Sequence, residues 1–176
     1  MEPTARPDVL QAWLELSETT SVMRARLNQR LQSDAGLSLA DNLVLCQVAM
    51  APDARMRMVE IAEVLNVVKS AVTKTVDRLE GRGLLARVRE GDDRRSVHAA
   101  LTAAGAEVFR RAQPVFLDAV SEGLYGPLSA AEVNELRRLL GKLLGAGRAR
   151  RAEPPSPLEA TPGASPPGRR AGAGPG

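Results

Sequence analysis

The chain has 176 residues, a formal net charge of +3, one cysteine and one histidine. This length predicts one domain with extensions, and 44% hydrophobic residues suffice for a globular core. A lone cysteine excludes an internal disulfide, and one Cys with one His gives no metal site. No nucleophile–base pair and no glycine-rich phosphate loop occurs, so we expect no enzyme and no cofactor. No long apolar run or basic-then-apolar leader is present, which predicts a cytoplasmic protein without a membrane span.

A long helix is expected first, over about residues 8–34. Leu10, Trp13 and Leu14 form one apolar stripe, and Met23 and Leu27 continue it. A length of about 25 residues is twice the mean helix length, near 12. Trp13 most often belongs to a dimer core at such a position, and stacking on a ligand is the alternative role.

The next helix begins at Ser38, where Asp41 three residues on resembles a capping box, and ends before Pro52. Cys46 lies in an apolar stretch of this helix. A buried, small hydrophobic side chain is the expected role. A redox-sensing thiol is the alternative.

Two shorter helices follow. Met58 to Leu65 has one apolar stripe, and Asn66 tolerates the left-handed conformation that turns the chain. The second helix spans about residues 68–82, with Val72, Val76 and Leu79 facing inward. Its other face holds short hydroxyls and basic groups, which suit base edges and phosphate oxygens. An ordinary amphipathic helix with a solvated face is the alternative. The outward residues are Ser70, Thr73, Lys74 and Asp77, flanked by Lys69 and Arg78.

A two-stranded hairpin is expected after Gly83, which we expect to form the C-cap of the preceding helix. Residues 84–89 and 96–101 alternate with a period of two, and His98 falls on the outward side. The tip, residues 91–95, contains consecutive arginines, which have no packing purpose there. Arginines on a hairpin can enter a narrow minor groove, and Asp93 can orient one of them by a bidentate pair.

Two helices close the ordered part of the chain. Thr102 caps the first, Pro114 should kink it, and Ser129 with Glu132 forms a capping box for the second. The apolar faces of the end helices need a partner, and a twofold dimer is the economical one. Residues 148–176, rich in Pro, Gly, Ala and Arg, predict a disordered tail.

The positive charge is unevenly placed. The tail holds five arginines against two glutamates, which accounts for the whole excess of +3. Residues 66–95 nevertheless hold eight Lys or Arg against five acids. DNA binding must therefore come from a local patch, which supplies the salt-dependent part of affinity.

Several segments resemble the MarR family of winged-helix transcription regulators: residues 39–45, 61–65 and 70–84, and the spacing D-x-R-x5-L-T-x2-G from Asp93 to Gly105. The resemblance covers roughly residues 8–146. It implies groove or phosphate contacts for residues of the second short helix and a wing-tip role for Arg95, oriented by Asp93. The family often has serine where Val68 stands, and valine cannot cap a helix. The expected DNA-binding residues are Lys69, Ser70, Thr73, Lys74, Arg78, Asp93, Arg94 and Arg95.

The expected fold is mainly α with a small β-hairpin wing. Residues 1–147 form a winged helix-turn-helix domain, with a DNA-binding unit at about 38–102 and dimerisation helices at about 8–34 and 102–147. The expected function is a ligand-responsive repressor that binds a palindromic DNA operator as a homodimer. Relatives bind small aromatic or anionic effectors between the dimer helices and the DNA-binding lobes. The alternatives are a redox regulator based on Cys46 and a winged-helix protein-interaction module.

Overall fold

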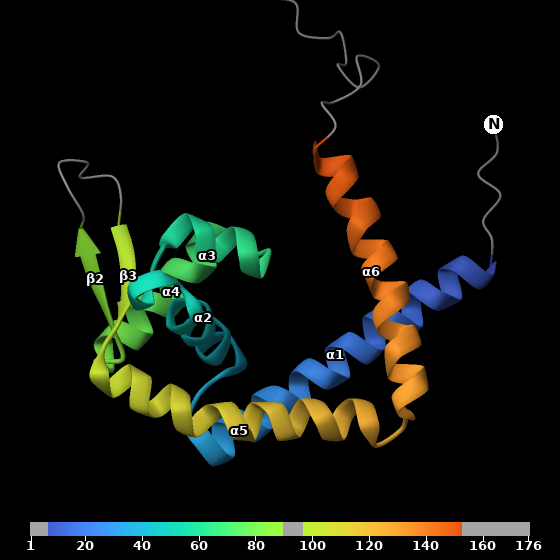
Figure 1. The fold of residues 1–176 in the computed structure, drawn as a ribbon, viewed down its shortest axis with the longest axis horizontal. Coiled ribbons are helices and arrows are strands. Elements are labelled where there is room, and N and C mark those ends of the chain that lie inside the picture. Colours follow the sequence, from blue (N-terminus) through green and yellow to red (C-terminus); the bar gives the residue numbers. More distant parts are fainter. Residues whose placement is uncertain (1–6, 90–96, 153–176) are drawn as a thin grey trace, which may run out of the picture. The chain divides into compact units, whose positions relative to one another are not determined.

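The computed structural model describes residues 7–89 and 97–152 (Figure 1). The chain divides into two compact units, Met1–Leu128 and Ser129–Gly176. The first contains five α-helices, a single 3₁₀ turn and three strands within its described residues, and the second contains one helix. The elements are α1 Pro7–Ala35, α2 Leu39–Met50, η1 Pro52–Ala54, β1 Arg55–Arg57, α3 Met58–Leu65, α4 Lys69–Gly81, β2 Leu85–Arg89, β3 Val97–Leu101, α5 Ala103–Tyr125 and α6 Ala130–Ala152.

Side-chain caps set the helix starts that the sequence predicts. The Ser38 hydroxyl accepts from the Asp41 amide at 3.1 Å, and the Asp41 carboxylate accepts from the Ser38 amide at 3.1 Å. The Thr102 hydroxyl accepts from the Gly105 amide at 2.9 Å. Each bond satisfies an amide that the helix itself leaves without a partner. The predicted capping box of α2 and cap of α5 are confirmed, and α5 continues as one helix across Pro114.

The helix-turn-helix prediction is confirmed at both helices. α3 has the predicted bounds, and Asn66 has left-handed backbone angles of φ 53° and ψ 46° at its end. α4 begins after Val68, which occupies the N-cap position and makes no side-chain cap bond. α4 packs against α2, α3 and β2, so that its buried face is held from three sides.

The sheet has three antiparallel strands in the order β1-β3-β2, one more than the predicted hairpin. β1 pairs with β3, placing Arg57 opposite His98. A three-residue strand is too short to give an alternating pattern, and it forms only because β3 offers an open edge. The chain reaches that edge through a tight turn in which Asp53 and Ala54 both have positive φ.

The core of the first unit lies where α2, α3 and α4 meet the sheet and α5. Leu85 and Ala99 face this core from β2 and β3, and β2 pairs Arg87 with Ala99. α1 packs along α5 in the same unit (Figure 1). The buried core residues are Leu31, Leu37, Leu39, Val44, Leu45, Val48, Met58, Ile61, Ala62, Val72, Val76, Leu79, Leu84, Leu85, Ala99 and Ala112.

The second unit is α6. Its predicted capping box is confirmed, because the Ser129 amide donates to Glu132 at 2.8 Å and the Ser129 hydroxyl accepts from the Glu132 amide at 3.4 Å. The helix runs to Ala152, five residues beyond the predicted domain boundary at 147. The rest of the predicted tail, 153–176, lies outside the described residues. No described helix is long and apolar enough to cross a membrane.

Candidate nucleic-acid interface

The outward face of α4 presents the polar residues that the sequence places there. Lys69, Ser70 and Lys74 are exposed, and Thr73 is half-buried. The Thr73 hydroxyl donates to the Lys69 carbonyl at 3.0 Å, which leaves its methyl group and oxygen lone pairs for other contacts. The opposite face, with Val72, Val76 and Leu79, is buried. The helix therefore presents hydroxyls and ammonium groups to solvent from a fixed backbone.

Arg87 locks strand β2 to helix α4 and is not available as a simple surface cation. Its guanidinium forms ion pairs with the carboxylates of Asp77 and Glu80, with 2.5 Å from Nη1 to a Glu80 oxygen. The Arg87 amide also donates to Glu80 at 3.2 Å. The hydrogen bond to Asp77 and the two negative charges raise the pKa of Arg87 above its ordinary value. Arg87 therefore does not contribute to the basic patch as the sequence predicts. Its two ion pairs instead join strand β2 to helix α4.

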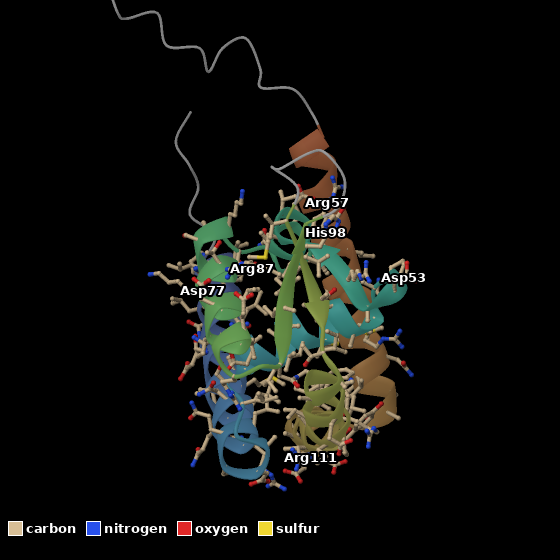
Figure 2. The ribbon with its side chains drawn as sticks, turned by 90° about the vertical axis from the view of Figure 1, so that its left-hand side faces the viewer. Asp53, Arg57, Asp77, Arg87, His98 and Arg111 are labelled. Atoms are coloured by element: carbon tan, nitrogen blue, oxygen red, sulfur yellow. The ribbon has the colours of Figure 1, made fainter. Side chains whose placement is uncertain are left out.

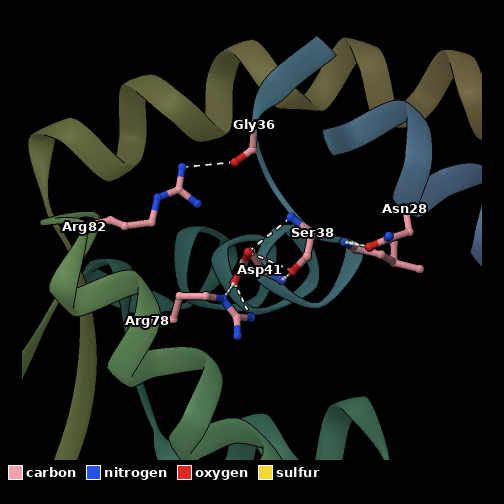
Figure 3. A network of polar contacts seen from close by, with 7 residues as sticks. Asn28, Gly36, Ser38, Asp41, Arg78 and Arg82 are labelled. Carbon is pink, nitrogen blue, oxygen red and sulfur yellow. Dashed lines mark hydrogen bonds and ion pairs between the residues drawn. The ribbon is translucent and has the colours of Figure 1, made fainter. Parts of the chain in front are cut away.

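Arg78 is held in a similar way, by a buried carboxylate on α2. Its Nε and Nη2 atoms donate to one oxygen of Asp41 at 2.9 and 2.6 Å (Figure 3). The Asp41 side chain is 3% exposed and the Arg78 side chain is 48% exposed. The second Asp41 oxygen accepts from the Ser38 amide and hydroxyl. One carboxylate thus caps α2 and anchors α4.

Two further bonds extend this network to the end of α1. The Asn28 side chain accepts from the Leu39 amide at 2.9 Å. Arg82 donates to the Gly36 carbonyl at 3.1 Å, so that α4 reaches the segment joining α1 to α2 (Figure 3). Arg78, a predicted DNA-binding residue, therefore already has two of its donors engaged by a structural partner.

The hairpin carries the remaining predicted site residues. Asp93, Arg94 and Arg95 lie outside the described residues. The described strands bring an unexpected arginine to this region, because Arg57 on β1 lies opposite His98 near the start of β3 (Figure 2). Arg57 donates to Glu60 at 2.7 Å through Nε, and this bond raises the pKa of Arg57. No local sequence signal marks Arg57, since its place depends on the unpredicted strand.

Trp13 and a cleft between α1 and α5 are separate features. Trp13 lies on α1 and is 63% exposed in the single chain. The cleft has a volume of about 440 Å³. Trp13 is not among the residues that line it, which are Met23, Arg26, Leu27, Gln29, Arg30, Ser33, Asp34, Ala119, Glu122 and Gly123. No cluster of three or more metal-ligating side chains occurs in the described part of the chain.

Cys46 is half-buried in α2, less enclosed than the sequence predicts. Its sulfur lies 3.6 Å from the Met50 sulfur. Burial raises the pKa of the Cys46 thiol, because desolvation disfavours the thiolate. The thiolate is the reactive form, so this environment disfavours oxidation.

We therefore expect slow alkylation of Cys46 in the native protein. The labelling rate should rise with pH, and the pH at which it reaches half its maximum should be higher for the folded protein than for the chain unfolded in urea. Burial raises the thiol pKa only in the folded state. We expect DNA binding by the parent to be insensitive to peroxide, and Cys46→Ser should leave it so. Rapid native labelling with loss of DNA binding would instead support the redox hypothesis.

A helix-turn-helix followed by an antiparallel hairpin, with a polar outward face on its second helix, defines a winged-helix DNA-binding protein. The sequence profile of the MarR family matches residues 37–97. The multiple antibiotic resistance protein MarR of Escherichia coli is 32% identical over 119 residues, which span 68% of this chain and 81% of the relative. The chain belongs to the MarR family, whose members are transcription regulators and not enzymes.

Solved structures agree with this assignment. Sco3205 of Streptomyces coelicolor, a MarR family regulator in complex with DNA, is 27% identical with a TM-score of 0.76, covering 84% of this chain and 91% of that one. A cysteine-to-serine variant of E. coli MarR with operator DNA is 30% identical with a TM-score of 0.70, covering 78% and 96%. Bordetella bronchiseptica BpsR, whose DNA binding is regulated by 6-hydroxynicotinic acid, is 25% identical with a TM-score of 0.68, covering 76% and 98%.

Proposed function

We propose that this chain is a ligand-responsive repressor that binds a palindromic operator as a homodimer. The observation that supports it best is the outward face of α4, where Lys69, Ser70, Thr73 and Lys74 stand on a helix held by α2, α3 and β2. Helix-turn-helix proteins insert their second helix into the major groove. The ion pairs of Arg78 and Arg87 hold α4 in place in the free protein, which lowers the entropic cost of binding DNA.

Within this proposal the residues divide into three roles. Ser70 and Thr73 contact base edges, while Lys69 and Lys74 contact bases or phosphates. Arg94 and Arg95 enter the minor groove beside the hairpin, with Asp93 orienting Arg95. Arg78 acts as a positioning residue for α4, since two of its donors are engaged by Asp41.

Exposed apolar side chains support the homodimer. α1 leaves Leu10, Trp13 and Leu14 exposed, and α6 leaves Leu143 and Leu144 exposed. Large apolar patches on a chain mark surfaces that bury against a partner. A second copy of the chain is the partner that would also give the protein twofold symmetry. A twofold dimer would bind two operator half-sites about one helical turn apart.

The cleft between α1 and α5 supports the ligand-responsive part of the proposal. Arg26 lines it beside apolar Met23 and Leu27, and Arg30 lines it as an ion pair with Asp34 at 2.6 Å. The Arg26 guanidinium would bind the carboxylate of a small aromatic acid and Met23 and Leu27 would contact its ring, and the DNA binding of the relative BpsR is regulated by such an acid. A ligand shifts the protein away from DNA only if it prefers a conformation that does not fit the operator.

The test begins with selection of a binding sequence from a pool of random DNA duplexes. The parent should enrich a palindrome, and a fluorescent duplex of that sequence then measures affinity across a salt series. Sedimentation of the complex should give two chains per duplex. A pool without enrichment, or binding that scrambled duplexes compete equally, would contradict sequence-specific repression.

Arg95→Ala is expected to weaken operator binding by about 1–3 kcal/mol, the scale of a good direct contact. Lys74→Ala should lower the slope of log affinity against log salt by about 2, because the dimer loses one phosphate contact in each half-site. Arg111→Ala is the matched control, since Arg111 lies on α5 far from α4 (Figure 2) and its side chain is 70% exposed. If all three variants bind like the parent, the wing and the α4 face are not DNA contacts.

A further inference from the structure

Val68, the N-cap residue of α4, is of a type that is disfavoured at this position of a helix. Val68 has N-cap backbone angles of φ −71° and ψ 145°, and its carbonyl accepts from the Ala71 amide at 3.0 Å. Serine, threonine, asparagine or aspartate at this position would bond an unpaired helix amide, and valine cannot. The Val68 side chain is nevertheless 69% exposed, and Val67 beside it is exposed as well. Valine here neither caps the helix nor joins the core.

Such local violations are expected at functional positions, where another requirement outweighs stability. The first residues of the second helix in a helix-turn-helix unit are those that reach base edges. Among the groups in the major groove, the C5-methyl of thymine is the one that an apolar side chain contacts favourably. Lys69 and Ser70, which follow directly, are exposed and polar, so Val68 is the apolar end of an otherwise polar face.

We propose that Val68 is a specificity-determining residue that packs against the methyl group of a thymine in each operator half-site. The proposal rests on the proposed function, because it requires α4 to enter the major groove. Contact between the valine and the thymine methyl removes both from water. Cytosine at that position lacks the methyl group and presents an amino group, and the valine side chain cannot accept a hydrogen bond from it.

Deoxyuridine differs from thymidine in the base only by this methyl group and therefore probes the contact directly. In the selected operator, each thymine of one half-site is replaced in turn by deoxyuridine. One replacement should weaken binding of the parent about four-fold, the ratio that burial of one methyl group supports. With Val68→Ala, which removes both γ-methyl groups, the penalty for deoxyuridine should fall well below four-fold. Val64→Ala is the matched control, because Val64 is a 58% exposed valine on α3, and it should keep the four-fold penalty.

Val68→Ser separates this role from a structural one. The serine should cap α4 and raise Tm by about 2–4 °C, while the discrimination between thymine and deoxyuridine disappears. An equal deoxyuridine penalty in the parent and in Val68→Ala, or no penalty at any thymine, would overturn the proposal and leave sequence-specific binding intact. A parent that enriches no sequence from the pool would overturn the proposed function, and this inference with it.

Discussion

Gly105→Ala is expected to destabilise the protein by about 3 kcal/mol, the upper end for overpacking, and to lower the yield of folded chain. A Cβ atom at this position would lie 2.0 Å from the Leu84 carbonyl oxygen and 3.0 Å from a Leu101 methyl group. The obstacle is backbone, which cannot rotate away as a flexible side chain can. The Leu84 carbonyl also accepts from the Thr102 amide at 3.2 Å, so moving it breaks the junction between the sheet and α5. Urea denaturation at fixed protein concentration measures the loss.

Gly81→Ala is the matched control for this substitution. Gly81 is the last residue of α4, has no positive φ, and has nothing within 4 Å of an added Cβ. Alanine there should be neutral or stabilise the protein by up to about 1 kcal/mol, since glycine is a poorer helix former. Equal stability of the two variants would mean that α5 does not approach Leu84 as closely as the structure has it.

Arg78→Met is expected to cost about 3 kcal/mol, the second largest effect. The substitution keeps most of the side-chain volume but leaves the Asp41 carboxylate buried without its cation. Ser38 still donates to that carboxylate, which keeps the cost near the lower end for a broken buried pair. The same variant should bind operator more weakly, because α4 loses the anchor that fixes it on α2.

Arg82→Met controls for the loss of an arginine at the same end of α4. Arg82 is exposed and makes one bond to a carbonyl, so its loss should change stability by no more than about 0.5 kcal/mol. The double variant Asp41→Asn with Arg78→Met removes the uncompensated charge and should recover part of the stability. Equal costs for Arg78→Met and Arg82→Met would show that the buried pair contributes nothing beyond an ordinary surface contact.

Local signals in the sequence were sufficient for the helices and the turn between the two short ones. Ser38 and Thr102 mark helix starts because a hydroxyl satisfies an amide one turn away, an interaction contained within four residues. Asn66 marks the turn because it tolerates positive φ. Helical periodicity predicts the outward face of α4, and Val68 is of a residue type that cannot cap a helix.

Only the tertiary structure decided which of the charged residues are already engaged. Arg78 meets Asp41 across 37 positions of sequence and Arg87 meets Asp77 across ten, and no local pattern pairs them. The same holds for β1, whose three residues form a strand only against the edge of β3. Gly105 belongs to a motif that can be read in the sequence. Glycine is required there because the Leu84 carbonyl packs where a Cβ atom would lie. Periodicity and capping act within a few residues, whereas ion pairing, strand addition and close packing depend on segments that only the folded chain brings together.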